Sequence, residues 1–147
     1  MVLERFRLDG HVAIVTGAGR GIGAASALAL AEAGADVLLA ARTEGQLQEV
    51  AAKIEALGRK AVVVLSDLSD LDQVAKLPQI AVDSFGRLDE VINNVGGSMP
   101  KEFVKTNATA LEGAFHFNVS TAHVLTRAAL PHLLAGEASA YYHGYVM

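Results

Sequence analysis

The chain has no cysteine and no tryptophan, and only three of its 147 residues are proline. The absence of cysteine excludes disulfide bonds, thiol catalysis and thiolate metal sites within this sequence. There is also no excess of positive charge, because 12 basic side chains face 16 acidic ones. A nucleic-acid-binding surface or a polybasic membrane-binding patch is therefore not expected.

The N-terminal residues mix charged and apolar side chains, and no apolar run approaches the roughly 18 residues that span a bilayer. We expect a soluble, cytoplasmic protein.

Apolar residues make up 52% of the sequence and charged residues 19%, which is too apolar for a disordered chain. A length of 147 residues suits one domain, and no linker, repeat or change in composition divides it. The sequence therefore predicts a single domain over residues 1–147 with its own hydrophobic core.

Short apolar runs alternate with longer stretches of helical character. The runs at 12–15, 37–40, 61–65 and 88–93 predict strands, of which the first two are expected to be buried, and the stretches at 22–34, 43–57, 70–85 and 108–134 predict helices. Strands that recur at intervals of about 25 residues with helices between them predict right-handed crossovers. We expect a Rossmann-like, doubly wound parallel sheet in three α/β/α layers. Pro78 lies inside the third helical stretch and predicts a break or kink there.

The sharpest local signal is Thr-Gly-Ala-Gly-Arg-Gly-Ile-Gly at residues 16–23, between the first predicted strand and the first predicted helix. Glycine allows a tight turn with positive φ and lets a diphosphate approach the backbone, where a Cβ would collide. The helix that begins there directs its free N–H groups at an anion. A strand–helix turn can also be glycine-rich for packing alone, but this position favours nucleotide binding.

The spacing T-G-x-x-x-G-x-G, with Asn-Asn-Val-Gly at residues 93–96 after the fourth predicted strand, resembles the short-chain dehydrogenase/reductase family. Asp67-Leu68 after the third strand and Asn118 in the last helix add two further matches. The resemblance covers residues 8–134, whereas residues 135–147 diverge. Val95 departs mildly from the alanine that is usual at its position in the family's motif.

The resemblance implies a role in cofactor binding for each matching residue. The diphosphate would be lined by Gly17, Gly21, Ile22 and Gly23. The cofactor ribose would be contacted by Asn94, Val95 and Gly96. Asp67 would accept from the adenine amino group, Leu68 would bracket the ring, and Asn93 would tie adjacent strands. Asp67 could instead cap the following turn, and the asparagine pair could be ordinary turn residues.

The choice between the two nicotinamide cofactors can be argued from charge. Dinucleotide-binding folds that select NAD place an acid at the end of the second strand. Here that place holds Ala41-Arg42, and Arg20 stands in the glycine turn. Two guanidinium groups near a 2′-phosphate would form charge-assisted hydrogen bonds, each unit pair worth about 4 kcal/mol before desolvation. We therefore predict NADP(H) rather than NAD(H), although Arg42 could be a solvated surface cation.

The family's hydride-transfer enzymes use a serine, a tyrosine with a lysine four positions later, and an asparagine that anchors a proton-relay water. Asn118 matches the asparagine and is the predicted catalytic residue, although it could instead repair a bend in the long helix. No Tyr-x-x-x-Lys occurs, because the last lysine is Lys105. An unassisted phenol has a pKa near 10 and is a poor base at neutral pH.

The C-terminal residues contain Ser139 and three tyrosines, Tyr141, Tyr142 and Tyr145. Ser139 precedes the expected fifth strand, so it does not replace the family's serine. We interpret residues 140–147 as a β-prone edge segment rather than a catalytic patch.

Two functions from different classes remain open. The resemblance implies an NADP(H)-dependent oxidoreductase that interconverts a carbonyl compound and a secondary alcohol, provided that the chain is part of a longer polypeptide. Alternatively, the chain is a catalytically silent nucleotide-binding module that binds cofactor or pairs with a full-length relative. Substrate identity does not follow from the sequence.

Neither a metal site nor a monomer is expected. The histidines have no His-x-x-x-His pair and no carboxylate at ligand spacing, so they are predicted to serve packing or an interface.

In the family, the helix that corresponds to the last predicted one packs against its mate in a second subunit. The apolar residues expected to form that face predict a homo-oligomer, a dimer or tetramer: Phe103, Leu111, Phe115, Val119, Val124 and Leu125. Part of the face could instead be buried against the chain's own sheet.

Overall fold

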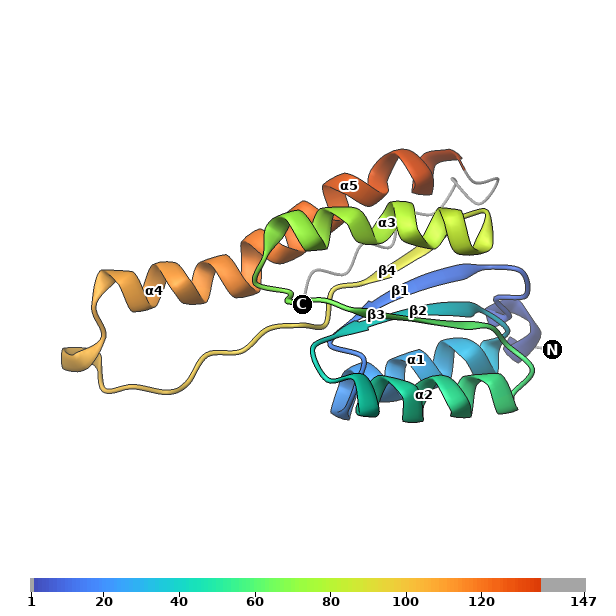
Figure 1. Ribbon diagram of the computed structural model, residues 1–147, viewed down its shortest axis with the longest axis horizontal. Coiled ribbons are helices and arrows are strands. Elements are labelled where there is room, and N and C mark those ends of the chain that lie inside the picture. The colour runs from blue at the N-terminus through green and yellow to red at the C-terminus, as the bar shows by residue number, and fades with distance from the viewer. Residues whose placement is uncertain (1, 136–147) are drawn as a thin grey trace.

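The computed structural model describes residues 2–135, which form three layers around a parallel sheet (Figure 1). The strands are β1 (Val12–Thr16), β2 (Asp36–Ala41), β3 (Ala61–Leu65) and β4 (Glu90–Ile92), in the spatial order β3-β2-β1-β4. Every neighbouring pair is parallel. This arrangement confirms the Rossmann-like α/β fold predicted from the alternating apolar pattern.

Helices cover both faces of the sheet. One face carries α1 (Gly21–Ala33) and α2 (Glu44–Ala56), and the other carries α3 (Leu71–Phe85) and α5 (Thr121–Ala135), as Figure 1 shows. Ile14 and Leu38 belong to the core beneath α3 and α5, whereas Val15 and Leu39 face α1 and α2. Because both faces are covered, β1 is buried at every position, and its uninterrupted apolar run follows from that.

Glycine and polar residues end or begin the helices largely as the sequence indicates. Gly34 ends α1 in the left-handed conformation, with φ 115°, and its N–H bonds the Ala31 carbonyl. Thr43 is the N-cap residue of α2, but its hydroxyl makes no capping hydrogen bond. Asp70 does cap α3, since its side chain accepts from the N–H groups of Asp72 and Gln73.

The break predicted at Pro78 does not occur. The backbone remains helical from Leu71 to Phe85, with Pro78 inside the helix (Figure 1). Pro78 is buried together with Leu77 and Ala81. Burial of this face on both sides of the proline holds the helix together and offsets the lost ladder hydrogen bond.

The long helical region predicted at 108–134 is present but irregular. It consists of α4 (Ala108–Phe115), a π-helical turn at His116–Ser120 and α5, and we call His116–Ser120 the π segment. The chain stays helical throughout, and α4 projects beyond the sheet (Figure 1). A π-helical turn inserted in an α-helix often marks a functional position.

The predicted apolar face of this region divides into two parts. Leu125 is fully buried and Val124 packs against the core beneath α3 and α5. By contrast, Leu111 and Phe115 on α4 are 67% and 60% exposed. Phe103 is 92% exposed and lies in a 3₁₀ turn (Phe103–Lys105) before the helix, not on it as predicted. The half nearer the sheet is therefore used within the chain, as the sequence analysis allowed, and the projecting half is left uncovered.

None of the described helices combines the length and apolar character required to cross a bilayer. Ser139, the three tyrosines and the predicted edge segment at 140–147 lie outside the described residues.

Candidate functional site

The predicted cofactor-binding residues meet at the carboxyl edge of the sheet. The glycine turn follows β1, Arg42 follows β2, Asp67 follows β3, and residues 93–96 follow β4. Because all four strands are parallel, these segments emerge at the same edge. In open α/β sheets that edge is where ligands bind.

A buried threonine ties the ends of β1 and β4 together at this edge. The hydroxyl of Thr16 donates to the Ile92 carbonyl (3.2 Å) and accepts from the N–H groups of Asn94 (3.0 Å) and Val95 (3.1 Å). The Asn94 side-chain amide donates to the carbonyls of Thr16 (2.9 Å) and Gly17 (3.4 Å). Sequence reasoning gave Thr16 no role, although its place between a buried strand and the glycine turn was the available signal.

The glycine turn is packed tightly against β1 on its inner side and is open on its outer side. Gly17 and Gly21 have positive φ values of 65° and 57°. A Cβ at Gly23 would lie 2.2 Å from the Gly17 carbonyl oxygen, so the first turn of α1 can approach β1 only with glycine there. A Cβ at Gly21 would meet nothing within 4 Å. The turn is therefore tightly packed at Gly23 and open at Gly21, and a bound diphosphate needs such open space beside the backbone.

The N-terminus of α1 has unused hydrogen-bond donors. Arg20 occupies the N-cap position without a side-chain capping bond, and the first turn has no acidic residue. An α-helix begins with N–H groups that have no partner within the helix, and here no described side chain caps them. Ile22 in the same turn is 75% exposed. These amides and the helix dipole fit an anion such as a diphosphate.

Two arginine side chains near this turn form no bonds within the described part of the chain. Arg20 and Arg42 are both exposed, and neither side chain makes a hydrogen bond or ion pair there, although the charge of Arg42 acts on Asp67. Their backbones are neighbours, because a Cβ at Gly19 would lie 3.9 Å from the Cβ of Ala41. The end of β2 thus presents a guanidinium where NAD-selecting folds present an acid.

Asp67 is an exposed carboxylate held by its own turn. Its Oδ1 accepts from the Ser69 N–H (3.0 Å) and the Ser69 hydroxyl (2.7 Å). These bonds, aided by the positive charge of Arg42, lower the pKa of Asp67 below its ordinary value. The capping role is therefore present, and Oδ2 still accepts no bond from the described residues. Leu68 is 3% exposed and packs in the core, so any contact that it makes with an adenine is through its main chain.

Asn118 is in the π segment and holds the loop that follows β4. Its Oδ1 accepts from the Gly97 N–H (2.8 Å), and its Nδ2 donates to the carbonyls of Gly97 (3.1 Å) and Ala114 (2.8 Å). A Cβ at Gly96 would lie 2.6 Å from Oδ1, so the loop can pass this close only with glycine there. The bond to Ala114 also satisfies a carbonyl next to the π turn, so helix repair and loop positioning coexist.

Within the described residues, the side chain of Asn93 does not make the tie between strands that was expected of it. Its side-chain amide donates to the hydroxyl of Thr126 on α5 (3.0 Å), not to a neighbouring strand. The tie between β4 and β1 is made by Asn94 instead. Consecutive residues point in opposite directions as β4 ends, so one amide faces the covering helix and the other faces β1.

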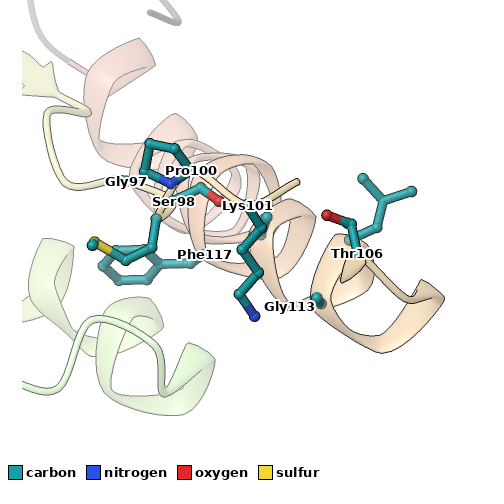
Figure 2. A pocket seen from close by; sticks show the side chains of 11 residues that line it. Gly97, Ser98, Pro100, Lys101, Thr106, Gly113 and Phe117 are labelled. Atoms are coloured by element: carbon teal, nitrogen blue, oxygen red, sulfur yellow. The ribbon is translucent and has the colours of Figure 1, made fainter. Parts of the chain in front are cut away.

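A cavity of about 600 Å³ lies between the loop that begins at Gly97 and helix α4. Figure 2 shows the Phe117 ring, the Lys101 side chain and Gly113 around it. None of the predicted cofactor-binding residues lines this cavity, but Gly97, which Asn118 holds, does. The cavity therefore borders the candidate site without forming part of it.

Among the described residues, His11, Asp89 and Glu90 have potential metal-ligand atoms within 4.8 Å of one another. They lie at the amino ends of β1 and β4, at the opposite edge of the sheet. His11 Nδ1 bonds Glu90 Oε1 (2.6 Å), and Asp89 accepts from Arg87 (2.6 and 2.8 Å). Burial raises the pKa of Glu90, although the bond to His11 opposes that effect. His11 and Glu90 bond each other, and Asp89 accepts from Arg87 and the Val12 N–H, so these contacts account for the position of each side chain.

Comparisons with known proteins agree with this geometry. A family model described as short chain dehydrogenase matches residues 11–140. An uncharacterized oxidoreductase of Mycobacterium tuberculosis is 54% identical over 134 residues, which cover 91% of this chain and 51% of that protein. The chain spans about half the length of the curated relatives it matches.

Solved structures of similar fold carry different cofactors. A short-chain dehydrogenase from Burkholderia cenocepacia in complex with NADP is 37% identical, with a TM-score of 0.82 over 86% of this chain and 52% of that one. A 7α-hydroxysteroid dehydrogenase in complex with NADH is 32% identical, with a TM-score of 0.83 over 88% of this chain and 50% of that one.

Replacing Gly23 by alanine should disrupt the site from within. The new Cβ would collide with the Gly17 carbonyl, so we expect the free energy of unfolding to fall by about 1–3 kcal/mol. Gly45 is the matched control, because a Cβ at that exposed helical position meets nothing within 4 Å. Gly45→Ala should leave stability unchanged or raise it by up to about 1 kcal/mol. Urea denaturation measures both, and equal stabilities of the two variants would contradict the packing described.

Proposed function

Because this chain belongs to the short-chain dehydrogenase family, we propose that it is the coenzyme-binding part of an NADP(H)-dependent oxidoreductase. The enzyme would interconvert small carbonyl compounds and secondary alcohols in the cytoplasm. One observation carries the proposal: the open glycine turn, the uncapped start of α1, two arginines, Asp67 and Asn118 are set along one sheet edge. Such an edge is chemically suited to an extended, anionic dinucleotide.

NADP(H) bound here would supply a hydride donor or acceptor to the substrate carbon. The first-turn amides of α1 would bind its diphosphate, and Arg20 with Arg42 would bind the 2′-phosphate. Asp67 is anionic and would accept from the adenine amino group through its remaining oxygen. Residues 94–96 would lie along the ribose. Asn118 would keep the loop at Gly97 in place beside the nicotinamide end.

The preference for NADP(H) rests on residues of this chain, since solved relatives contain either cofactor. A carboxylate at the end of β2 would bind the ribose hydroxyls of NAD and repel a 2′-phosphate. Here Ala41 ends the strand and Arg42 follows. The Arg42 side chain forms no ion pair with the described residues, so no ion pair would have to break when it binds a phosphate. The desolvation cost is also small at an exposed position.

Arg42→Ala should reduce NADPH binding selectively. A hydrogen bond to a charged group contributes about 1.5–3 kcal/mol, so the NADPH dissociation constant should rise about tenfold or more. NADH has no 2′-phosphate, so its affinity should change less than about twofold. Titration calorimetry measures both, with Arg127→Ala on α5 as the control for loss of an exposed guanidinium. Tighter binding of NADH than NADPH by the unaltered chain would refute the preference.

The second candidate function is a catalytically silent module. The observation in its favour is that the sequence contains no Tyr-x-x-x-Lys. A module of this kind would use the same sheet edge to bind the coenzyme and would transfer no hydride.

Two measurements on the protein isolated from its source separate these functions. The enzyme proposal expects a denatured mass above 15.3 kDa and loss of NADPH absorbance with at least one carbonyl compound of a broad panel. A mass of 15.3 kDa, with NADPH bound but consumed with no compound, would overturn it in favour of the silent module.

We also propose that the protein is a homo-oligomer, at least a dimer. The projecting half of the predicted apolar face remains exposed, with Phe103, Leu111 and Phe115 uncovered. Exposed apolar side chains on α4 and on the turn before it mark an interaction surface. Light scattering at micromolar concentration should give at least twice the monomer mass, and Leu111→Lys should lower it, whereas Leu57→Lys on the separate α2 side should not. A monomeric mass for the unaltered protein would contradict the proposal.

A further inference from the structure

The π segment contacts the loop after β3 as well as the loop after β4. His116 Nε2 lies 2.7 Å from the Ser69 carbonyl oxygen, and the buried Thr121 hydroxyl donates to the Leu68 carbonyl (3.1 Å). The same Thr121 hydroxyl lies 3.3 Å from the His116 carbonyl. Residues almost fifty positions apart in the sequence are thus joined by side chains of the π segment and of the first residue of α5.

The direction of the His116 bond is fixed by its partner. A carbonyl oxygen only accepts hydrogen bonds, so Nε2 must carry the proton and donate. Ser69 in turn donates its N–H and its hydroxyl to Asp67 Oδ1. His116 therefore fixes the main chain of the residue that orients Asp67.

Two residues further along, Asn118 holds Gly97 on the other side. The two side chains of the π segment bond to different loops, since His116 meets the Ser69 carbonyl and Asn118 meets the Gly97 main chain. His116 therefore reaches the Asp67–Asp70 loop while Asn118 reaches the loop at Gly97. The π segment bridges the two loops proposed to hold the adenine end and the nicotinamide end of the coenzyme.

We propose that His116 is a positioning residue for the coenzyme site, an inference that rests on the proposed function. It sets the position of the Asp67 loop relative to Asn118 and Gly97. Binding at the adenine end then restrains the π segment, and through Asn118 it orders the loop at the nicotinamide end. The side chains of Arg20 and Arg42 do not link the two loops, because neither makes a hydrogen bond or ion pair with the described residues.

The test uses the 147-residue chain with 2′,5′-ADP, a probe that carries the adenine and the 2′-phosphate but no nicotinamide. His116→Phe keeps an aromatic ring and removes the donor, and His116→Gln restores an N–H at a similar reach. The matched control is His123→Phe, an exposed histidine of α5 with no hydrogen bond among the described residues. His116→Ala is a second donor-free variant should the phenylalanine variant not fold.

Removal of the donor should weaken 2′,5′-ADP binding about fivefold, the effect of one net hydrogen bond. The glutamine variant should recover affinity to within about twofold of the unaltered chain, and His123→Phe should not change it. In nuclear magnetic resonance, the Ser69 amide should exchange faster in the donor-free variants without ligand. Added 2′,5′-ADP should slow exchange of the Gly97 amide in the unaltered chain and should not do so in those variants.

The possible failures are distinguishable. If the unaltered chain does not bind 2′,5′-ADP, the proposed function fails and this inference fails with it. If the unaltered chain binds but the donor-free variants bind equally well, or the glutamine variant does not recover affinity, only the role of His116 is overturned. Ligand-induced protection of Gly97 that persists without the His116 donor would equally refute the bridge.

Discussion

The buried hydroxyl of Thr16 is the contact on which the rest of the site depends. It donates one hydrogen bond and accepts two, and all of them join the end of β1 to the end of β4. A buried hydroxyl without partners costs free energy, so the two strand ends are most stable at the spacing that satisfies it. That spacing places the glycine turn against Asn94 and sets where the loop at Gly96 begins. The loop, in turn, is what Asn118 holds.

The chemistry at the sheet edge follows from groups that the protein leaves partly unused. The first amides of α1 have no side-chain cap, Arg42 has no ion-pair partner among the described residues, and Asp67 has a free oxygen. Each lies on a segment fixed by buried neighbours, so each is exposed yet held in place. An anionic dinucleotide would fit this distribution, because the amides and guanidinium groups would attract its phosphates and the carboxylate would accept from its adenine amino group.

The sequence was sufficient to predict the parallel sheet, its helices and the meeting of the proposed cofactor-binding residues at one edge of the sheet. Runs such as 12–15 and 37–40 read as strands because burial on both faces demands apolar residues throughout, and parallel strands must end at one edge. It was insufficient wherever a side chain's partner lies on an element distant in sequence. Asn93 bonds Thr126 because α5 covers that end of β4, and the uninterrupted helix at Pro78 depends on burial that no local pattern records.

The π segment was unpredictable for a related reason. The sequence reads as one long helix across it, and the bonds that Asn118 makes to Gly97 and Ala114 become visible only in the fold. The roles of Thr16, His116 and Thr121 were missed because their partners are backbone atoms of other segments. Sequence patterns report side-chain character, whereas main-chain acceptors become visible only when the fold brings them close.

The start of α1 has no side-chain cap, and this lowers the stability of that helix end. A serine or aspartate in place of Arg20 would cap the helix and add about 0.5–2 kcal/mol to stability. Such a side chain would occupy the same amide hydrogens and, as an acid, repel phosphate. The start of α1 is thus less stable than a capped helix end would be, and in exchange its amide N–H groups stay available to the proposed anionic ligand.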